Sequence, residues 1–281
     1  MLSTENLGTV TGKLDAMAKD LGIQCLAKVP YRFHRKLSAV SKSWNALLSC
    51  SHFYKERQRN GECEQGVVSL NPTELTETDF NVMIYYPIGH WWEILPEILE
   101  EFELDYTEYH QCVFVRSKHQ LVVVGLFNRR TDIEVVLIFD FLSRKWRLGA
   151  DMPRNRFEFA CAASPTEGLV YIGGGYNGPY TEERSPYQLE AFVYNVEENK
   201  WNSLPPMNSD PLLDLCAGVF LDGKFYVVLH QQSESAQVYD PHTRLWRNIN
   251  GEPNAHYVNS CVDALQDMMF YLQEFGRILM I

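Results

Sequence analysis

Four times in this chain an aromatic residue stands seven positions before a tryptophan, and no other feature limits the possible folds as strongly. The pairs are Tyr85/Trp92, Phe139/Trp146, Tyr194/Trp201 and Tyr239/Trp246. Successive tryptophans are 54, 55 and 45 residues apart, and four cysteines keep a similar interval, at Cys112, Cys161, Cys216 and Cys261. A period of roughly 45–55 residues built from short β runs is typical of a β-propeller with one blade per repeat. A mainly β repeat scaffold is therefore expected over most of the chain.

The repeat is best formed between residues 154 and 207. Strands are expected at 157–164, 169–172, 191–195 and 200–204, because β-branched and aromatic residues gather there between glycine, proline and asparagine. The second of these strands ends in Gly173-Gly174-Gly175. A large ring at a fixed position suits such a fold, since a blade packs only on its two neighbours and the ring fills the gap between sheets.

The order of strand, double glycine, long loop, tyrosine, spacer and tryptophan resembles the kelch repeat. The resemblance extends from about residue 81 to the end of the chain and is strongest at 154–207. It implies a kelch β-propeller of about four repeats, which need not all be complete, and repeat scaffolds of this kind more often bind than catalyse. The glycine pair is incomplete in the neighbouring repeats, where 121–126 holds one glycine and 225–230 holds none.

The two ends of the repeat region differ from its middle. The first repeat is expected to supply only its last two strands, 82–86 and 91–95. The final repeat is expected to supply 257–264, 268–272 and 277–281, and it has no tryptophan of its own. Either the C-terminal strands complete the first blade and close a ring of four, or the ring is open and the chain is short for its family. The sequence stops inside an expected third strand, which favours the open ring, whose edge strands would be unpaired.

The first part of the chain has a different character. Residues 1–16 are polar and are expected to be disordered, and residues 17–61 show a helical pattern. Nine Lys and Arg side chains in 19–59 stand against two acidic ones, whereas 62–281 hold fifteen basic and thirty-two acidic side chains. This asymmetry indicates a basic helical module at 17–61 and an acidic repeat body at 66–281, with different partners.

Apolar residues of the module follow a helical spacing. The spacing advances by 4, 3, 4 and 3 positions through Phe33, Leu37, Val40, Trp44 and Leu47. It predicts one amphipathic helix or two consecutive short helices, broken near Ser41 and Ser43. A module of this size cannot bury all of its apolar surface alone, so a partner or the repeat body is expected to cover part of it.

Residues 20–30, which end in Val29-Pro30, and residues 40–48, which contain Trp44, resemble the F-box. The resemblance covers about 17–61 and implies docking to an acidic Skp1-type protein, and through it to a cullin. Met17-Ala18 stands where the family opens with Leu-Pro, so a proline contact with that partner is missing. The residues that the resemblance assigns to Skp1 binding or to the module core are Leu21, Ile23, Leu26, Val29, Pro30, Val40, Trp44 and Leu47.

An F-box followed by kelch repeats is mainly a plant combination. Residues 29–34 and 56–61 are similar to the plant group that recruits phenylalanine ammonia-lyase for degradation. The resemblance therefore implies a substrate-recognition subunit of a Skp1–cullin–F-box ubiquitin ligase that delivers a protein to the proteasome and regulates phenylpropanoid metabolism. The alternative is a kelch interaction scaffold without ligase activity.

The loops after each second strand are where kelch propellers usually bind their ligands, and functional residues gather on loops held by a rigid scaffold. These loops span 127–132, 176–188 and 230–235. Arg and Tyr are enriched at binding hot spots. The candidate substrate contacts are Arg129, Arg130, Tyr176, Tyr180, Arg184, Gln231 and Glu234. An acidic stretch at 97–108 is expected to be a solvated loop, or else a surface for a basic substrate patch.

Composition argues against a secreted, membrane or nucleic-acid-binding protein. The seven cysteines include no CxxC pair, no signal pattern opens the chain, and apolar runs such as 121–124 are far shorter than the ~20 residues that cross a bilayer. A reduced protein of the cytoplasm or nucleus, without a membrane partner, is expected. The basic module could bind nucleic acid, but its charges alternate with apolar residues as on a solvated helix face, and the acidic body would repel phosphate.

Three patterns resemble cofactor or metal sites, but a non-catalytic protein without cofactor or metal is expected. Gly173, Gly175 and Gly178 fit a dinucleotide fingerprint, but no helix pattern follows to hold a pyrophosphate. The repeat cysteines would line a central channel too wide for one zinc ion. Kelch propellers also occur in copper oxidases, but the histidines here show no repeated ligand spacing.

Overall fold

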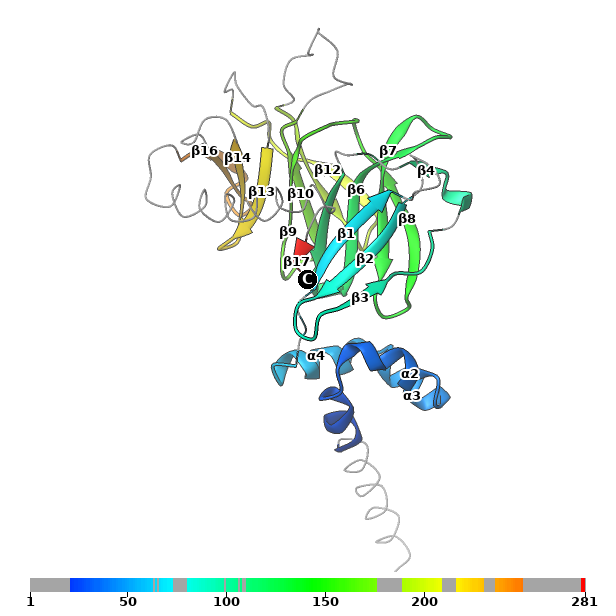
Figure 1. Ribbon diagram of the computed structural model, residues 1–281. Coiled ribbons are helices and arrows are strands. Elements are labelled where there is room, and N and C mark those ends of the chain that lie inside the picture. Colours follow the sequence, from blue (N-terminus) through cyan, green and yellow to red (C-terminus); the bar gives the residue numbers. More distant parts are fainter. Residues whose placement is uncertain are drawn as a thin grey trace, which may run out of the picture. The chain divides into compact units, whose positions relative to one another are not determined.

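The computed structural model describes residues 21–62, 64, 66–72, 80–98, 100–105, 107, 110–175, 189–208, 216–229, 236–249 and 279–280. Its contacts divide the chain into two units, residues 1–65 and 66–281. Helices make up the first unit and antiparallel strands most of the second (Figure 1). The predictions for residues 1–16, for Met17-Ala18 and for strands at 257–264 and 268–272 lie outside the described residues.

The second unit consists of four antiparallel sheets of four or five strands. The first sheet comprises β1 (Val67–Pro72), β2 (Phe80–Tyr86), β3 (Trp91–Ile94) and β17 (Leu279–Met280). The second comprises β4 (Leu104–Asp105), β5 (Gln111–Val115), β6 (Gln120–Asn128), β7 (Ile133–Asp140) and β8 (Lys145–Asp151). The third comprises β9 (Ala160–Ala163), β10 (Leu169–Gly173), β11 (Ala191–Asn195) and β12 (Lys200–Ser203). The fourth comprises β13 (Cys216–Leu221), β14 (Lys224–Leu229), β15 (Ala236–Asp240) and β16 (Leu245–Asn248).

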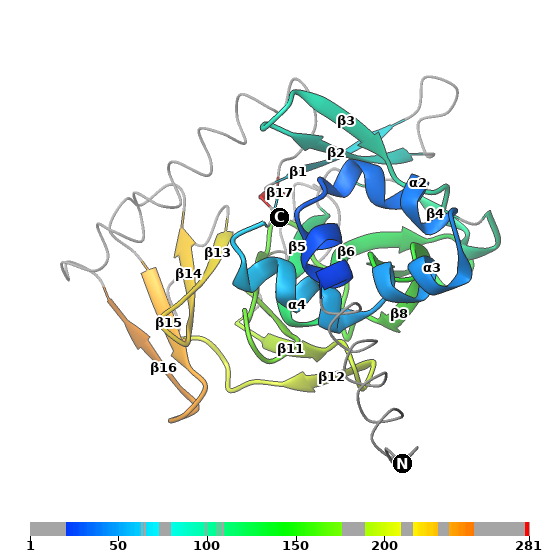
Figure 2. The ribbon, with the colours of Figure 1, turned by 90° about the horizontal axis from the view of Figure 1, so that it is seen from below.

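The sheets follow one another around a common centre, as Figure 2 shows. Neighbouring sheets meet along one strand each: β17 lies near β5, β5 near β9, and β9 near β13. These strands are the innermost of their sheets, and Cys112, Cys161 and Cys216 lie in three of them, as the repeat predicts. The architecture is mainly β, with few helices, and is compatible with an incomplete propeller preceded by a helical region.

The strands predicted for the best repeat are present as β9 to β12, with ends that differ by up to three residues. The two strands predicted for the first repeat are present as β2 and β3, but the prediction that this part of the chain supplies only two strands was wrong, because β1 pairs with β2 from Val67/Tyr85 to Pro72/Phe80. Of the strands predicted at the C-terminus, β17 lies in the first sheet and pairs with β1 through Val67/Met280 and Val68/Leu279. The first sheet thus combines segments from both ends of the repeat region.

A recurring turn explains why the aromatic residue and the tryptophan are seven positions apart. In each sheet the two residues face each other in register on the last two strands, as in Tyr194/Trp201, with ring centroids 4.9 Å apart in that pair. The residue after the aromatic is Asp or Asn in three sheets, and its side chain accepts two backbone N–H groups of the turn, as Asp140 does from Leu142 and Ser143. The residue two before each tryptophan is left-handed, as Arg144 is at φ 55°. Side chains of this kind favour turns because they satisfy local backbone donors.

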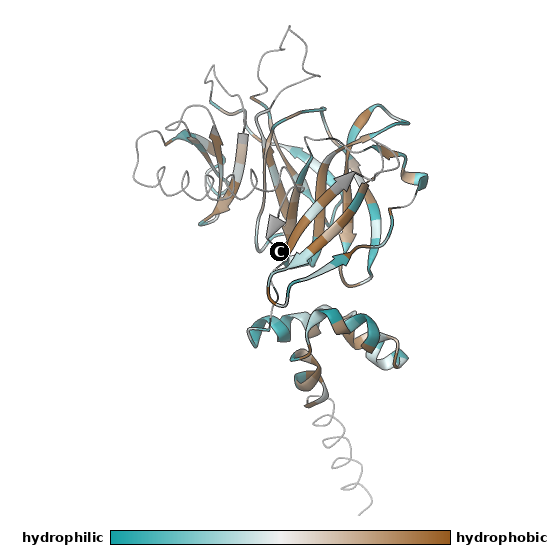
Figure 3. Ribbon diagram, in the orientation of Figure 1, coloured by the Kyte–Doolittle hydropathy of each residue, from teal (hydrophilic) through white to brown (hydrophobic). Residues whose placement is uncertain are grey.

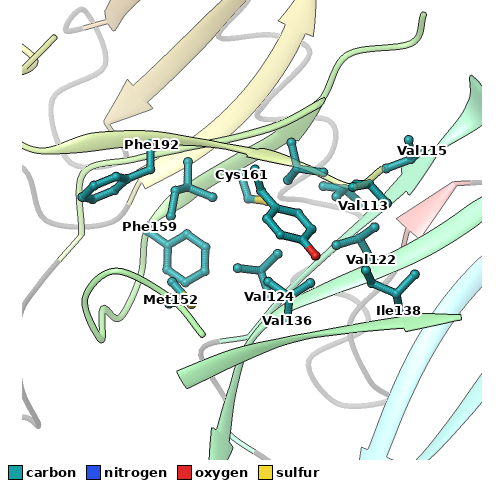
Figure 4. Close-up of a cluster of buried hydrophobic side chains, with 14 residues drawn as sticks. Val113, Val115, Val122, Val124, Val136, Ile138, Met152, Phe159, Cys161 and Phe192 are labelled. Atoms are coloured by element: carbon teal, nitrogen blue, oxygen red, sulfur yellow. The ribbon is translucent and has the colours of Figure 1, made fainter. Parts of the chain in front are cut away.

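The core between the second and third sheets is a layer of interlocked side chains (Figure 4). Val124 and Ile138 of the second sheet cluster with Ile172 and Tyr194 of the third and with Phe159, which directly precedes β9, and all five are fully buried. Figure 3 colours these strands mainly brown and the turns between them mainly teal. Burial of such side chains is the main stabilising term of the fold, at ~25 cal/mol per Å² of apolar surface.

Each tryptophan after the first also binds the chain of the preceding sheet. The indole N–H groups donate to backbone carbonyls in the last strand of the preceding sheet or just after it: Trp146 to Pro96 (2.7 Å), Trp201 to Ala150 (3.4 Å) and Trp246 to Pro205 (2.8 Å). A buried indole N–H needs such an acceptor. The periodic tryptophan therefore joins sheet to sheet.

Candidate functional site

The first unit is a small helical module. It contains a helix that includes residues 21–27, then η1 (Tyr31–Phe33), α2 (His34–Ser38), α3 (Lys42–Leu48) and α4 (Ser51–Arg59). The Ser41 hydroxyl accepts the backbone N–H of Trp44 at 3.2 Å and caps the N-terminus of α3. A serine at this position favours the start of a new helix. Of the two arrangements expected for residues 33–47, the one with consecutive short helices is present.

The module has its own apolar core. Ala27, Leu48 and Phe53 are buried, and the partly buried side chains of Ile23, Leu26, Leu37, Leu47 and Tyr54 pack against them. The apolar spacing predicted one continuous apolar face, but only part of it is buried. Leu37 and Leu47 face this core, whereas Phe33 and Val40 are exposed. Phe53 was not predicted because it lies on a later helix, beyond the spacing that ended at Leu47.

A buried arginine ties the segments of the module together. Arg57 of α4 is 4% exposed, and its guanidinium donates to the backbone carbonyls of Ala27 (2.6 Å), Val29 (2.5 Å) and Glu62 (2.7 Å). Bonds from a charged donor contribute more to stability than bonds between neutral groups. Arg57 thus fixes the chain around Val29 and Pro30, the dipeptide that carries the F-box resemblance.

His34 lies beside this arginine and is buried as well. Its Nε2 is 3.0 Å from the Val29 carbonyl, and its ring packs edge-on against Phe53. Burial, together with the nearby charge of Arg57, lowers the pKa of His34 to about 4, and the bond to Val29 opposes this shift. The imidazole is therefore neutral near pH 7, which suits its place between an arginine and an aromatic ring.

The eight residues assigned to Skp1 binding or to the module core divide by exposure. Ile23, Leu26 and Leu47 pack against the core, and Val29 and Trp44 are half-buried. Leu21 and Val40 are 58% and 64% exposed, and Pro30 is exposed. Basic side chains are exposed on the same module at Lys28, Arg32, Arg35, Lys36, Lys42, Lys55 and Arg59. An apolar set within a basic surface can bind a partner that is apolar and acidic.

In the second unit, two of the predicted substrate contacts lie in the turn between β6 and β7. The Arg130 guanidinium binds the Glu103 carboxylate with two bonds of 3.0 and 3.1 Å, and Arg129 lies 3.3 Å from Asp105. These arginine side chains are 70% and 50% exposed, so their ion pairs are surface pairs of small energy. Both guanidinium groups remain accessible to a partner. Tyr176, Tyr180, Arg184, Gln231 and Glu234 lie outside the described residues.

The link between the second and third sheets connects two of these loops. The Asn155 side chain accepts the N–H of Glu134 and donates to the Asp132 carbonyl, at the end of the first loop. Arg156 is fully buried, and its Nη1 donates to the carbonyls of Gly174 (3.1 Å) and Glu190 (3.0 Å). Gly174 and Glu190 flank residues 176–188, the longest of the predicted binding loops. Arg156 therefore holds the two ends of that loop together.

A buried carboxyl completes this cluster. Glu134 is 2% exposed, and its Oε2 accepts the backbone N–H of Arg156 at 2.8 Å. Burial raises the pKa of Glu134 to about 7, against the opposing effects of that bond and of the Arg156 charge. Sequence reasoning missed Glu134, Asn155 and Arg156, because their partners are 18 to 34 positions away.

The pKa of Glu134 predicts a pH-dependent stability. Between pH ~4.5 and ~7 the folded protein holds a proton that the unfolded chain has released, so the free energy of unfolding falls as pH rises through this window, by about 3 kcal/mol. Glu134→Gln removes the titrating group and keeps an acceptor for Arg156. Urea unfolding from pH 4.5 to 8 measures the free energy of unfolding of both proteins, and the difference between the native chain and Glu134→Gln should change with pH in this window. A difference that is independent of pH would contradict the raised pKa of Glu134.

The described residues contain no group of three or more His, Cys, Asp or Glu that could hold a metal ion. Among those same residues, no helix is long and apolar enough to cross a membrane. Burial raises the pKa of the Cys161 thiol, which disfavours the thiolate. The described residues therefore offer two exposed sets of side chains, the apolar and basic set of the helical module and the pair Arg129 and Arg130 of the second sheet.

Comparison with known protein families identifies one motif in the second unit. Residues 160–208 match the Kelch motif. This is the stretch where the sequence repeat is best formed and where the third sheet lies.

Similar proteins include several F-box/kelch-repeat proteins of Arabidopsis thaliana. One is 28% identical over 277 residues, covering 84% of this chain and 65% of the relative. A second relative, SKIP20, is 25% identical, and the overlap covers 88% of this chain and 69% of SKIP20. A third is 28% identical, and the overlap covers 81% of this chain and 66% of that relative. The chain thus spans about two thirds of the length of these relatives. Its homologues are plant F-box/kelch-repeat proteins, and it carries a kelch motif.

Proposed function

We propose that this chain is the substrate-recognition subunit of a Skp1–cullin–F-box ubiquitin ligase. The helical module docks the Skp1-type protein, and the sheets capture the protein to be degraded. One observation carries the proposal: a separate basic module that exposes Leu21, Pro30 and Val40 precedes a repeat unit with a kelch motif. The relatives bear the name of this combination.

The proposed role requires no catalytic group in this chain. The subunit holds lysines of the captured protein near a ubiquitin-loaded enzyme, so that transfer becomes effectively intramolecular. Two buried arginines support this role: Arg57 joins the segments of the docking module, and Arg156 binds the carbonyls of Gly174 and Glu190, which flank the proposed substrate loop.

Docking is proposed to use the exposed apolar set and the half-buried Trp44. Leu21 and Val40 would be covered by apolar side chains of the partner, and the surrounding lysines and arginines would face its acidic residues. Ile23, Leu26 and Leu47 would instead support this surface from the core. Substitutions at the first group should weaken binding without unfolding the module, and substitutions at the second should do both.

Co-purification tests the proposal. Tagged full-length chain should recover a Skp1-type protein and a cullin from its source cells, and Trp44→Ala or deletion of residues 17–61 should abolish that recovery. Exposed Gln58 on α4 offers a matched control, since Gln58→Glu changes the same module outside the apolar set. Recovery that survives the deletion would contradict docking through this module. Partners that bind the sheets while no Skp1-type protein is recovered would favour an interaction scaffold without ligase activity.

The captured protein is proposed to be an enzyme of phenylpropanoid metabolism, with phenylalanine ammonia-lyase as the first candidate. Support comes from residues 29–34 and 56–61, which resemble the plant group with that target. Proximity labelling in the native cell, with the label fused to the full chain, should mark this enzyme in the cytoplasm or nucleus. Labelled proteins that do not include it would remove the metabolic assignment and leave the adaptor role standing.

A further inference from the structure

One serine of the helical module follows a run of basic and aromatic residues. Arg35 stands three positions before Ser38, and Lys36 stands two positions before it. Phe33 stands five positions before the same serine, and no other serine or threonine of the chain follows an arginine by three positions. Protein kinases select their substrates by charge patterns of this kind, because acidic side chains in the kinase cleft pair with basic residues near the modified hydroxyl.

The structure presents the residues of this pattern to solvent. In α2, His34 is buried and Leu37 packs against the module core, so these two side chains hold the helix from one side. Arg35 and Lys36 are exposed, and Phe33, just before the helix, is 38% exposed. The basic and aromatic residues that a kinase would recognise are therefore accessible.

The Ser38 hydroxyl lies at the end of this helix. It donates to the backbone carbonyl of Arg35 at 2.9 Å, in an exposed position. Ser38 is the last residue of α2, which is five residues long, and residues 39–41 after it are exposed. A helix of this length has little stability of its own. Its last turn can therefore open and place the hydroxyl in a kinase cleft.

A phosphate at this position changes the charge of the docking surface. It adds about −1.5 to −2 charge at neutral pH. The exposed basic residues Arg35, Lys36 and Lys42 all lie within four positions of Ser38. Val40, one of the exposed apolar residues of the proposed docking surface, lies two positions away. Because like charges across an interface disfavour binding, the phosphate opposes an acidic partner where the unmodified surface attracts one.

We propose that Ser38 is a phosphorylation site for a serine/threonine kinase that selects basic residues before its target, and that the phosphate weakens docking of the acidic partner. The Ser38 Oγ attacks the γ-phosphorus of ATP, and the bond from that phosphorus to the β–γ bridging oxygen breaks. ADP leaves, and the hydroxyl proton passes to the catalytic base of the kinase. The effect on docking rests on the proposed function, whereas the modification itself does not.

Phosphorylation of the purified full chain tests the site. The probe is the catalytic subunit of cyclic-AMP-dependent protein kinase with MgATP, and mass spectrometry locates and counts the phosphates. The native chain should take up phosphate at Ser38, and Ser38→Ala should lose that phosphate. Arg35→Ala should be modified about tenfold more slowly, because it lacks a charge-assisted contact with the kinase.

Ser43→Ala is the matched control, because Ser43 is also exposed but follows Val40, not a basic residue, by three positions. This variant should be phosphorylated at Ser38 like the native chain. A native chain that takes up no phosphate at Ser38, or an Arg35→Ala chain that is modified as fast as the native one, would overturn the site.

Titration of a purified Skp1-type protein into both forms of the chain tests the consequence. The phosphorylated form should bind about tenfold more weakly than the unmodified form in about 50 mM salt, and the difference should shrink in about 500 mM salt, because salt screens exposed charges. Equal affinity of the two forms, or a loss that does not respond to salt, would overturn the proposed effect of the phosphate. Absence of binding by the unmodified form would instead contradict the adaptor role and leave the modification to its own test.

Discussion

Arg57→Ala is expected to unfold the helical module while the sheets remain folded. The substitution removes the donor for three backbone carbonyls, those of Ala27, Val29 and Glu62. Each buried carbonyl that loses its donor costs about 1–3 kcal/mol, so the loss of three is comparable to the whole stability of so small a unit. Hydrogen exchange of residues 21–62 should become fast in this variant, and exchange in β6, β7 and β10 should stay slow.

Arg59 provides the control for this experiment. It lies two residues further along α4, is 70% exposed in its side chain and pairs with Glu56 at the surface. Arg59→Ala should therefore change the free energy of unfolding by less than about 1 kcal/mol. Arg57→Lys should fall between the two, because a lysine carries the charge but not the planar fork that reaches several carbonyls. Equal exchange in Arg57→Ala and Arg59→Ala would show that the buried network does not hold the module together.

Trp146→Ala should have the largest effect in the second unit. The indole is 8% exposed, lies 4.9 Å from the ring of Phe139 and donates to Pro96 of the preceding link. Truncation of a buried tryptophan costs about 3–5 kcal/mol, and the lost bond leaves a carbonyl without its donor. Urea unfolding followed by circular dichroism should show a clear fall in the midpoint.

A substitution at another residue of an outer strand serves as the control, because it removes apolar surface without removing a contact between sheets. Leu245 lies next to Trp246 on β16 and is 66% exposed. Leu245→Ala should shift the free energy of unfolding by no more than ~0.5 kcal/mol. Trp146→Phe, which retains the ring contact with Phe139, should fall between the two. If Trp146→Ala were as mild as Leu245→Ala, the periodic tryptophan would not join the sheets.

Much of the fold could be predicted because its strongest signals are local. The aromatic and the tryptophan face each other across a single turn, so seven positions of sequence contain the whole motif. The strand β1 was missed because it lies before the first aromatic–tryptophan pair and takes its partners from β2 and from β17 at the other end of the chain. Sequence spacing does not reveal pairing over such a separation.

The candidate sites could be predicted only in part, for a related reason. Apolar spacing located the module but did not distinguish core from surface, so Leu47 and Val40 were grouped although one packs inside and the other is exposed. Arg57 and Arg156 each bind carbonyls 18 to 34 positions away, and Arg57 also binds the nearby carbonyl of Glu62. Nothing in the sequence around a single arginine indicates such contacts. Their roles follow from the folded chain alone.

Titration calorimetry of the purified full chain with a purified Skp1-type protein tests the central claim most directly. We predict saturable one-to-one binding that Leu21→Glu combined with Val40→Glu weakens by more than about tenfold, with unchanged unfolding, whereas Gln58→Glu binds like the native chain. Absence of binding by the native chain, or equal affinity for all three proteins, would contradict an adaptor that docks through the exposed apolar residues of its helical module.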